Sequence, residues 1–334
     1  MDKIAVAVIG AGFIADYHAR AILQQRDIEM KVVCDRTTEA AQRFAAKYGI
    51  KETASDVSDV LSREDIDAAI LCTPNKFHAP QAMAFLKRGK DVFIEKPMAM
   101  NPAEGREIAA AARENKRLVM VGHMWRFDAE VDYTKELVAA GKIGRIVKTK
   151  GYGIHENWGP SGWFTKKELA GGGALPDMGV HAVDTVRYIL GDPRPKQVYA
   201  RIGTFYGDYD VDDTAVVVIS WDNGTTSIVE SGWWHPHADG PEAATRLFGT
   251  AGYASIFPTK FKTKRGDSCE EFTPTMPERE EHCCQAMYNR QMQHFADCIR
   301  NRNEPAVGTG QGQIVLEIVA AAYESAKTRQ AVML

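Results

Sequence analysis

The chain has 334 residues, a length typical of two domains. Its 45% hydrophobic and 25% charged residues are those of an ordinary soluble globular protein, and a net charge of −3 argues against a nucleic-acid partner. No apolar run reaches the roughly 18 residues of a membrane span, so we expect no membrane partner.

The first third of the chain alternates between strand and helix patterns. An apolar strand opens it and runs into a glycine loop, which is unlike the cleavage site of a signal peptide. Strands are predicted at residues 4–9, 30–34, 68–72, 92–94 and 118–121, and helices at residues 14–25, 39–48, 80–88 and 102–115. Short apolar strands that alternate with helices predict an α/β domain with a doubly wound parallel sheet.

The pattern changes in the second half, where strand follows strand. Strands are predicted at residues 146–154, 197–205, 215–221 and 226–234, and helices at residues 177–190, 288–300 and 313–329. Asn223-Gly224 between the last two strands predicts a hairpin. We therefore expect domains at residues 1–122 and 123–334. The second should be an α/β domain with an open, largely antiparallel sheet, and helix 313–329 should pack back on the first.

The first strand runs into the turn Gly10-Ala-Gly-Phe-Ile-Ala15, which is followed by a predicted helix. This is the Gly-x-Gly-x-x-Ala pattern in the strand–loop–helix context of a Rossmann dinucleotide-binding domain. Gly10 permits the tight turn, and Gly12 lets the backbone approach a pyrophosphate. Phe13 and Ile14 open the helix, whose N-terminal N–H groups favour the phosphates. The loop therefore predicts a nicotinamide dinucleotide cofactor.

The second predicted strand leads into Asp35, an acid at the expected distance from the glycine loop. Its carboxylate can accept hydrogen bonds from the adenosine ribose hydroxyls, which favours NAD. Arg36 beside it can instead meet the 2′-phosphate of NADP, so the sequence leaves NADP open. The alternative for Asp35 is an ordinary turn or helix N-cap acid.

Two more polar segments follow strands of the predicted parallel sheet. Because the carboxyl ends of parallel strands share one edge, where such folds bind ligands, both segments should border the cofactor. A Thr-Pro-Asn turn is also an ordinary way to begin a helix, which is the alternative for the first segment. The residues concerned are Thr73, Pro74, Asn75 and His78 in the first segment, and Glu95 and Lys96 in the second.

Lys96 stands directly before Pro97. The proline restricts Lys96 to extended geometry, and the tight bend without glycine favours a cis peptide bond between the two. The ammonium would then point into the cleft beside the nicotinamide. There it can hydrogen-bond a substrate hydroxyl and stabilise a developing alkoxide.

These features together resemble the glucose–fructose oxidoreductase / inositol dehydrogenase (Gfo/Idh/MocA) family, over essentially the whole chain. The motifs that carry the resemblance are Gly10-Ala-Gly12, Thr73-Pro-Asn75 with His78, Glu95-Lys96-Pro97, Val121-Gly122 with Arg126-Phe127, and Gly172-Gly173 leading to Asp177, Gly179, His181 and Asp184. The resemblance implies NAD(P)-dependent oxidation of a secondary alcohol or lactol on a sugar or cyclitol. It also implies a homodimer or homotetramer formed through the sheet of the second domain.

The segment from Gly171 to Leu190 supplies a predicted acid–base pair. Asp177 and His181 are four residues apart and would share one face of a helix. Removing hydride from an alcohol needs a base for the hydroxyl proton, and histidine titrates nearest to working pH. By resemblance, His181 is that base, Asp177 holds a sugar hydroxyl or tunes the pair, and Lys96 orients the reacting oxygen. For this stretch alone, a packed helix start is the alternative.

Three further residues are candidates for substrate contact. Arg126 lies just past the strand at 118–121, and His155 and Trp163 lie in an aromatic loop that suits the apolar face of a sugar ring. A packed connecting loop explains the aromatic residues equally well. His235 and His237 have a metal-like spacing, but no third ligand accompanies them, and we expect no metal.

The sequence thus predicts an NAD(P)-dependent dehydrogenase that acts on a ring alcohol of a sugar, glycoside or inositol. A non-catalytic NAD-dependent sensor on the same fold and a reductase of a non-sugar carbonyl or imine are the alternatives. The loss of the lysine, the aspartate or the histidine would favour them. The six cysteines form no Cys-x-x-Cys pair, which predicts reduced thiols and a cytoplasmic protein.

Overall fold

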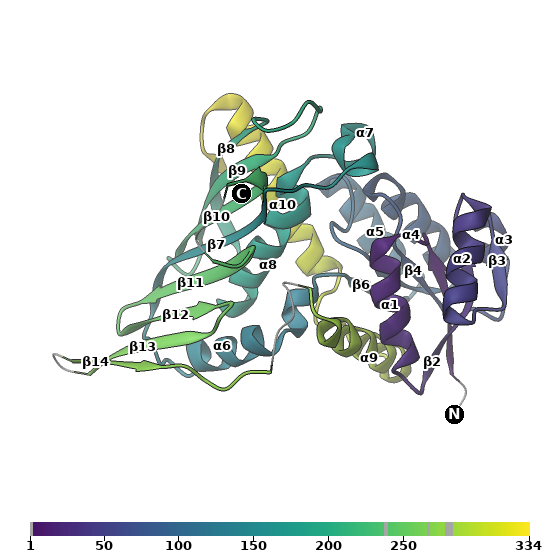
Figure 1. Cartoon of the computed structure of the whole chain (residues 1–334), viewed down its shortest axis with the longest axis horizontal. Coiled ribbons are helices and arrows are strands. Elements are labelled where there is room, and N and C mark those ends of the chain that lie inside the picture. The colour runs from purple at the N-terminus through teal and green to yellow at the C-terminus, as the bar shows by residue number, and fades with distance from the viewer. Residues whose placement is uncertain (1–2, 237–239, 266–267, 278–282) are drawn as a thin grey trace. The chain divides into compact units, whose positions relative to one another are not determined.

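The computed structural model describes residues 3–236, 240–265, 268–277 and 283–334, which fall into two compact units (Figure 1). Unit 1 comprises Met1–Met124 and Cys284–Leu316, and unit 2 comprises Trp125–Cys283 and Glu317–Leu334. The sequence-based division assigned residues 284–316 to the second domain. In the structure they join unit 1, where α9 (Gln285–Asn301) packs against α1 (Phe13–Leu23).

Unit 1 is built on a six-stranded parallel sheet with the order β3-β2-β1-β4-β5-β6. Its strands are β1 (Ile4–Ile9), β2 (Ile28–Cys34), β3 (Glu52–Ala54), β4 (Ala68–Leu71), β5 (Asp91–Ile94) and β6 (Val119–Val121). Every residue of β1, β4, β5 and β6 is buried, as expected where helices cover both faces of a sheet. The order in which successive strands are added to the sheet reverses between β1 and β4, and such sheets bind ligands at the carboxyl edge beside this point.

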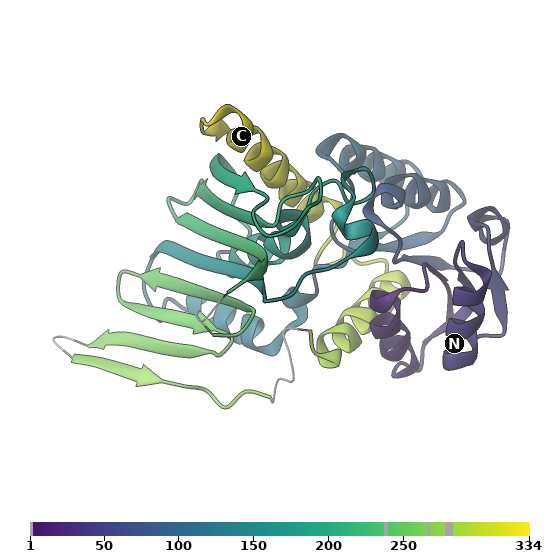
Figure 2. The same cartoon turned by 45° about the horizontal axis from the view of Figure 1, so that its top comes forward.

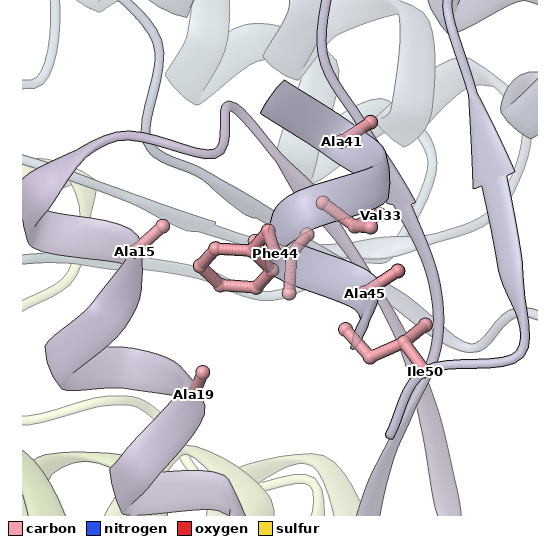
Figure 3. Packing of buried hydrophobic residues seen from close by; sticks show 8 residues of the cluster. Ala15, Ala19, Val33, Ala41, Phe44, Ala45 and Ile50 are labelled. Carbon is pink, nitrogen blue, oxygen red and sulfur yellow. The ribbon is translucent and has the colours of Figure 1, made fainter. Parts of the chain in front are cut away.

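Helices cover both faces of this sheet. Besides α1 and α9, unit 1 holds α2 (Thr38–Tyr48), α3 (Val57–Leu61), η1 (Asn75–Phe77), α4 (His78–Lys87) and α5 (Pro102–Glu114). Small residues let α1 lie close to α2, because Ala15 and Ala19 face the ring of Phe44 (Figure 3). The short elements β3 and α3 were not predicted, since a three-residue exposed strand and a five-residue helix carry too little periodicity.

Unit 2 is built on a nine-stranded sheet with the order β14-β13-β12-β11-β7-β10-β9-β8-β15. Its strands are β7 (Ile146–Glu156), β8 (Pro195–Gly203), β9 (Thr214–Trp221), β10 (Thr226–His235), β11 (Ala243–Gly249), β12 (Gly252–Ile256), β13 (Lys260–Arg265), β14 (Ser268–Phe272) and β15 (Val332–Met333). All neighbouring pairs are antiparallel except β7 and β10, which are parallel. The predicted fold class is confirmed.

In unit 2, α6 and α8 lie against the same face of the sheet (Figure 2). The helices are α6 (Ala129–Ala139), α7 (Lys167–Ala170), α8 (Val180–Ile189) and the later part of α10 (Thr309–Thr328), with η2 (Met124–Phe127), η3 (Gly162–Thr165) and the π-helical turn η4 (Leu175–Gly179). A Cβ on Gly153 of β7 would lie 2.9 Å from the Met178 carbonyl oxygen, so η4 lies directly on the strand. In the part of the chain that the structure describes, no helix is long and apolar enough to cross a membrane.

Candidate active site

In the loop after β1, Gly10 is packed tightly against neighbouring backbone, whereas Gly12 faces open space. Gly10 has a φ of +95°, and a Cβ there would lie 2.7 Å from the Cys72 carbonyl oxygen, so no side chain fits. At Gly12, by contrast, an added Cβ would meet nothing within 4 Å. The backbone is thus bare directly before the N-terminus of α1, where unpaired N–H groups attract phosphate. These residues fit the pyrophosphate of a dinucleotide.

Because Gly12 faces open space, a substitution there should change NAD affinity without changing the stability of the fold. Gly12→Ala should weaken NAD binding about tenfold or more, because the methyl group would occupy the space through which the pyrophosphate reaches the backbone N–H groups. Since the φ of Gly12 is −87° and its surroundings are open, the free energy of unfolding should change by less than about 0.5 kcal/mol. NADH fluorescence titration and denaturant unfolding measure the two quantities.

Gly310→Ala is the matched control for this variant. Gly310 lies in the first turn of α10, where an added Cβ also meets nothing within 4 Å, and its substitution should leave NAD affinity unchanged. A Gly12→Ala variant that binds NAD as tightly as the wild type would contradict the pyrophosphate position.

Asp35 follows β2 and joins that strand to the glycine loop. Its Oδ2 accepts a hydrogen bond from the Ala11 N–H at 2.9 Å, and its Oδ1 accepts one from the Thr37 N–H at 2.8 Å. Each carboxylate oxygen can accept a second hydrogen bond, so the group can still receive ribose hydroxyls. Arg36 is exposed beside it.

Asp35→Asn should raise the Kd for NAD about tenfold while leaving the Kd for NADP unchanged or lower. The amide loses the charge that strengthens hydrogen bonds from ribose hydroxyls, and it no longer repels a 2′-phosphate. Titration with both nucleotides measures the ratio, and Glu114→Gln, an exposed acid at the end of α5, controls for net charge. Equal weakening of both nucleotides would contradict a contact between Asp35 and the 2′-hydroxyl of the ribose.

The segment after β5 holds Lys96 at the carboxyl edge of the sheet. The Lys96–Pro97 peptide bond is cis, as the sequence suggested, and the Lys96 side chain is half-buried. Glu95 is buried beneath it, where its carboxylate lies 2.6 Å from His18 Nε2 of α1 and accepts the Lys96 N–H at 3.1 Å. We therefore propose that Glu95 holds the segment after β5 against α1 and does not contact the cofactor.

His78 links the two predicted cofactor segments. Its Nδ1 lies 2.8 Å from the Pro97 carbonyl oxygen and its Nε2 lies 2.8 Å from the Thr73 carbonyl oxygen. Burial lowers the pKa of His78, although the two carbonyl oxygens favour its charged form. Thr73 donates its hydroxyl to Gln81 at 2.7 Å, and Asn75 is buried at the start of η1. Because these side chains hold the loops together, we propose a positioning role for His78.

In unit 2, the buried carboxylate of Asp212 organises the glycine-rich segment. It accepts the Gly173 N–H at 2.7 Å, the Leu175 N–H at 2.8 Å and the Tyr323 hydroxyl at 2.5 Å. Burial raises the pKa of Asp212, and these three hydrogen bonds work against that rise. They fix the start of η4, which carries Asp177, so Asp212 positions that residue from a distant part of the chain. No signal in the sequence indicates this role, because Val211-Asp212-Asp213 before a strand has no special spacing.

Asp177 and His181 lie on consecutive but different helical elements. Asp177 is in the π-helical turn η4, directly before α8, and its N–H donates to the Gly173 carbonyl oxygen at 3.1 Å. Its Oδ2 accepts the Trp233 indole N–H at 3.1 Å. His181 is buried in the first turn of α8, with its ring centroid 5.0 Å from that of Trp125.

His155, at the end of β7, lies between Asp177 and Glu242, and the sequence did not indicate a role for Glu242. Its Nε2 lies 3.8 Å from Asp177 Oδ2, and its Nδ1 lies 3.2 Å from Oε2 of Glu242. The ring stacks on Trp158 at a centroid distance of 3.7 Å. We call His155, Trp158, Asp177, Trp233 and Glu242 the His155 cluster. Trp163 stacks separately on Phe164 in η3, and His237 lies outside the described residues.

Arg126 is engaged in a buried ion-pair network. Its Nε and Nη2 donate to the two oxygens of Asp184 at 2.8 and 2.7 Å, and Nη1 and Nη2 donate to Asp192 at 3.0 and 2.7 Å. Although burial opposes its charge, the two carboxylates hold the pKa of Arg126 above its ordinary value. Arg187 also contacts Asp192, at 3.0 Å. We therefore propose a structural role for Arg126 in place of the predicted substrate contact.

Residues 4–123 match the model of an oxidoreductase family with an NAD-binding Rossmann fold, and residues 131–255 match the GFO/IDH/MocA C-terminal domain. D-glucoside 3-dehydrogenase of Escherichia coli K12 is 31% identical over 98% of this chain and 96% of its own length. The scyllo-inositol 2-dehydrogenase (NAD(+)) of Bacillus subtilis 168 is 28% identical over 99% and 96%. The crystal structure of an oxidoreductase domain protein from Kribbella flavida has a TM-score of 0.90 and 25% identity, with 100% and 99% covered.

A parallel sheet with a bare glycine loop, followed by a second α/β unit with a largely antiparallel sheet, defines a two-part NAD-binding oxidoreductase. The chain belongs to the GFO/IDH/MocA family of such enzymes. The family resemblance found in the sequence is confirmed.

Proposed function

We propose that the protein is an NAD-dependent dehydrogenase that oxidises a secondary ring alcohol, or a lactol, of a sugar, glycoside or cyclitol. The observation that carries this proposal is the bare backbone at Gly12 with Asp35 beside it, in a chain that also holds the His155 cluster of acids, imidazole and indoles. Indole and imidazole rings suit the apolar face of a sugar, and carboxylates suit its hydroxyl groups. Two relatives named as glucoside and inositol dehydrogenases support the substrate class.

The residues act in the following roles in this proposal. Unit 1 binds the dinucleotide through the loop from Gly10 to Ile14 and through Asp35, and the bound NAD supplies the hydride acceptor. Lys96 hydrogen-bonds the reacting oxygen and stabilises the developing alkoxide. His181 takes the hydroxyl proton, with Asp177 as its acid–base partner. His155 and Trp163 contact the sugar.

A panel of substrates tests this function. Monosaccharides, inositols and simple glycosides are assayed with NAD and with NADP by following nicotinamide absorbance. We expect turnover on at least one ring alcohol with a preference for NAD. If the protein binds NAD but oxidises none of the panel, the proposed substrate class is wrong.

We also propose that the protein is a homodimer or homotetramer formed through the sheet of unit 2. The face of the sheet opposite α6 and α8 carries a row across three paired strands, Tyr199, Val218 and Ile228, with Val216 beside it. Tyr199 and Val216 are 38% and 41% exposed. Light scattering from the purified protein determines the assembly, and a monomer at micromolar concentration would contradict this proposal.

A cytoplasmic location is part of the same proposal. It is supported by the six cysteines, all of which lie in described residues and are free. Fractionation of cells that express the chain from its own coding sequence tests the location, and recovery outside the cytoplasm would contradict it.

A further inference from the structure

His155 is held between two carboxylates, and this arrangement fixes which ring nitrogen carries the proton. Nδ1 lies 3.2 Å from Glu242 Oε2, within hydrogen-bond distance, whereas Nε2 lies 3.8 Å from Asp177 Oδ2. An ionised carboxylate only accepts hydrogen bonds, so Nδ1 must donate to Glu242. Nε2 is therefore the basic nitrogen of the neutral ring, and it faces the carboxylate of the proposed catalytic aspartate.

Glu242 is itself fixed in place. One of its oxygens accepts the Glu156 N–H at 2.9 Å and the Trp158 indole N–H. Partial burial works against its charge, but these bonds and the one from His155 hold the pKa of Glu242 below its ordinary value. Trp158 also stacks on the imidazole, with the rings 30° apart, and the face of an indole attracts a cation. Glu242 is thus held as an ionised acceptor for the Nδ1–H of His155.

We propose that Glu242 and His155 form a carboxylate–imidazole dyad that takes up the proton released at Asp177 when the alcohol is oxidised. This inference rests on the proposed function. In this proposal His181 passes the proton it took from the hydroxyl group to its partner Asp177, which restores the neutral His181. The O–H bond of protonated Asp177 then breaks and an N–H bond forms at His155 Nε2, while Nδ1 keeps its proton and Glu242 stabilises the imidazolium. The imidazolium then loses one proton to water, which restores the neutral ring and completes the balance.

The geometry is compatible with this transfer. The 3.8 Å between Nε2 and Oδ2 is a distance that a small side-chain rotation or one bridging water spans. Glu242 acts only through His155, so it is a positioning residue, comparable in role to the carboxylate that orients the histidine of a hydrolase triad.

The kinetic test uses Glu242→Gln. The glutamine oxygen can still accept from Trp158 and Glu156, so the local fold is retained while the charge is lost. We expect kcat to fall about tenfold or more with the Kd for NAD unchanged, and Glu242→Asp should recover part of the loss. Glu230→Gln is the matched control, because Glu230 forms a partly exposed pair with Lys150 at 3.3 Å. Unchanged turnover in Glu242→Gln would overturn the dyad.

Chemical rescue separates proton transfer from a structural role. In His155→Ala, added imidazole should raise kcat in proportion to its concentration, because the free base enters the space that the side chain left. The rescue should be several-fold weaker in the double variant that also carries Glu242→Gln. An absence of rescue, or equal rescue with and without Glu242, would overturn the proposal.

A measurement without substrate keeps this inference distinct from the proposed function. Nitrogen-15 NMR of the histidine rings, assigned with His155→Gln, should show a protonated Nδ1 in His155 whose signal shifts in Glu242→Gln. A neutral ring protonated at Nε2 would overturn the dyad even if the enzyme oxidises sugars. A protonated Nδ1 in a protein that oxidises no ring alcohol would instead count against the proposed function alone.

Discussion

Lys96→Ala is expected to lower turnover by about 10²-fold or more, while the Kd for NAD stays within about twofold. The ammonium is the group proposed to stabilise the alkoxide, and its loss leaves the glycine loop and Asp35 intact. The half-buried side chain follows a buried strand, so its removal should cost little folding stability. Steady-state kinetics and NADH titration measure the two effects, and Lys87→Ala, an exposed lysine at the end of α4, is the control.

Steady-state kinetics on His181 variants test its proposed role as the base that takes the hydroxyl proton. His181→Ala should lower kcat by a similar factor of about 10², because the proton of the hydroxyl group would lose its proposed acceptor. His181 is buried against Trp125, so His181→Gln is needed to separate lost basicity from a cavity. If both the Lys96 and the His181 variants retained wild-type turnover on the true substrate, the assigned roles would be wrong.

Arg126→Met is expected to reduce the free energy of unfolding by about 3–5 kcal/mol. The side chains of Arg126 and Asp184 are 1% and 2% exposed, so the substitution leaves a buried carboxylate without its guanidinium. Any loss of activity should follow the loss of folded protein, with the KM for substrate unchanged. Denaturant unfolding and kinetics on the folded fraction measure this.

A control variant and a double variant test whether the loss of stability at Arg126 comes from the buried unpaired charge. Lys150→Met breaks a pair in which both side chains are about 30% exposed, and it should cost less than about 1 kcal/mol. Asp184→Asn combined with Arg126→Met should recover part of the stability, because no unpaired charge remains. A large rise in KM with normal stability would restore the original prediction of substrate contact.

Much of unit 1 was predictable because its signals are local. The glycine loop, Asp35 and Lys96 each follow a short apolar strand, and parallel strands bring their carboxyl ends to one edge whatever the details of packing. The cis bond before Pro97 was suggested by the same local reasoning. Residue type and position along one strand were enough in each case.

Unit 2 was less predictable because its central strand, β7, pairs with β10 and β11, which are distant in sequence. Strands β11 to β14 were not predicted. They pair with one another in sequence order, but only the pairing of β11 with β7, across nearly a hundred residues, joins them to the rest of the sheet. Glu242 and His155 are separated by 87 positions, and β7 and β11 bring them together. No spacing rule in the sequence connects them.

The sequence by itself determined the family, the class of fold and the dinucleotide loop, because these depend on the order of short motifs and on local backbone geometry. Only the tertiary structure decided that Arg126 is bound in an ion-pair network, that Asp177 sits in a π-helical turn, and that Glu242 holds His155. Those facts depend on which charges the packing of sheet and helix buries together, and a linear pattern does not contain that information.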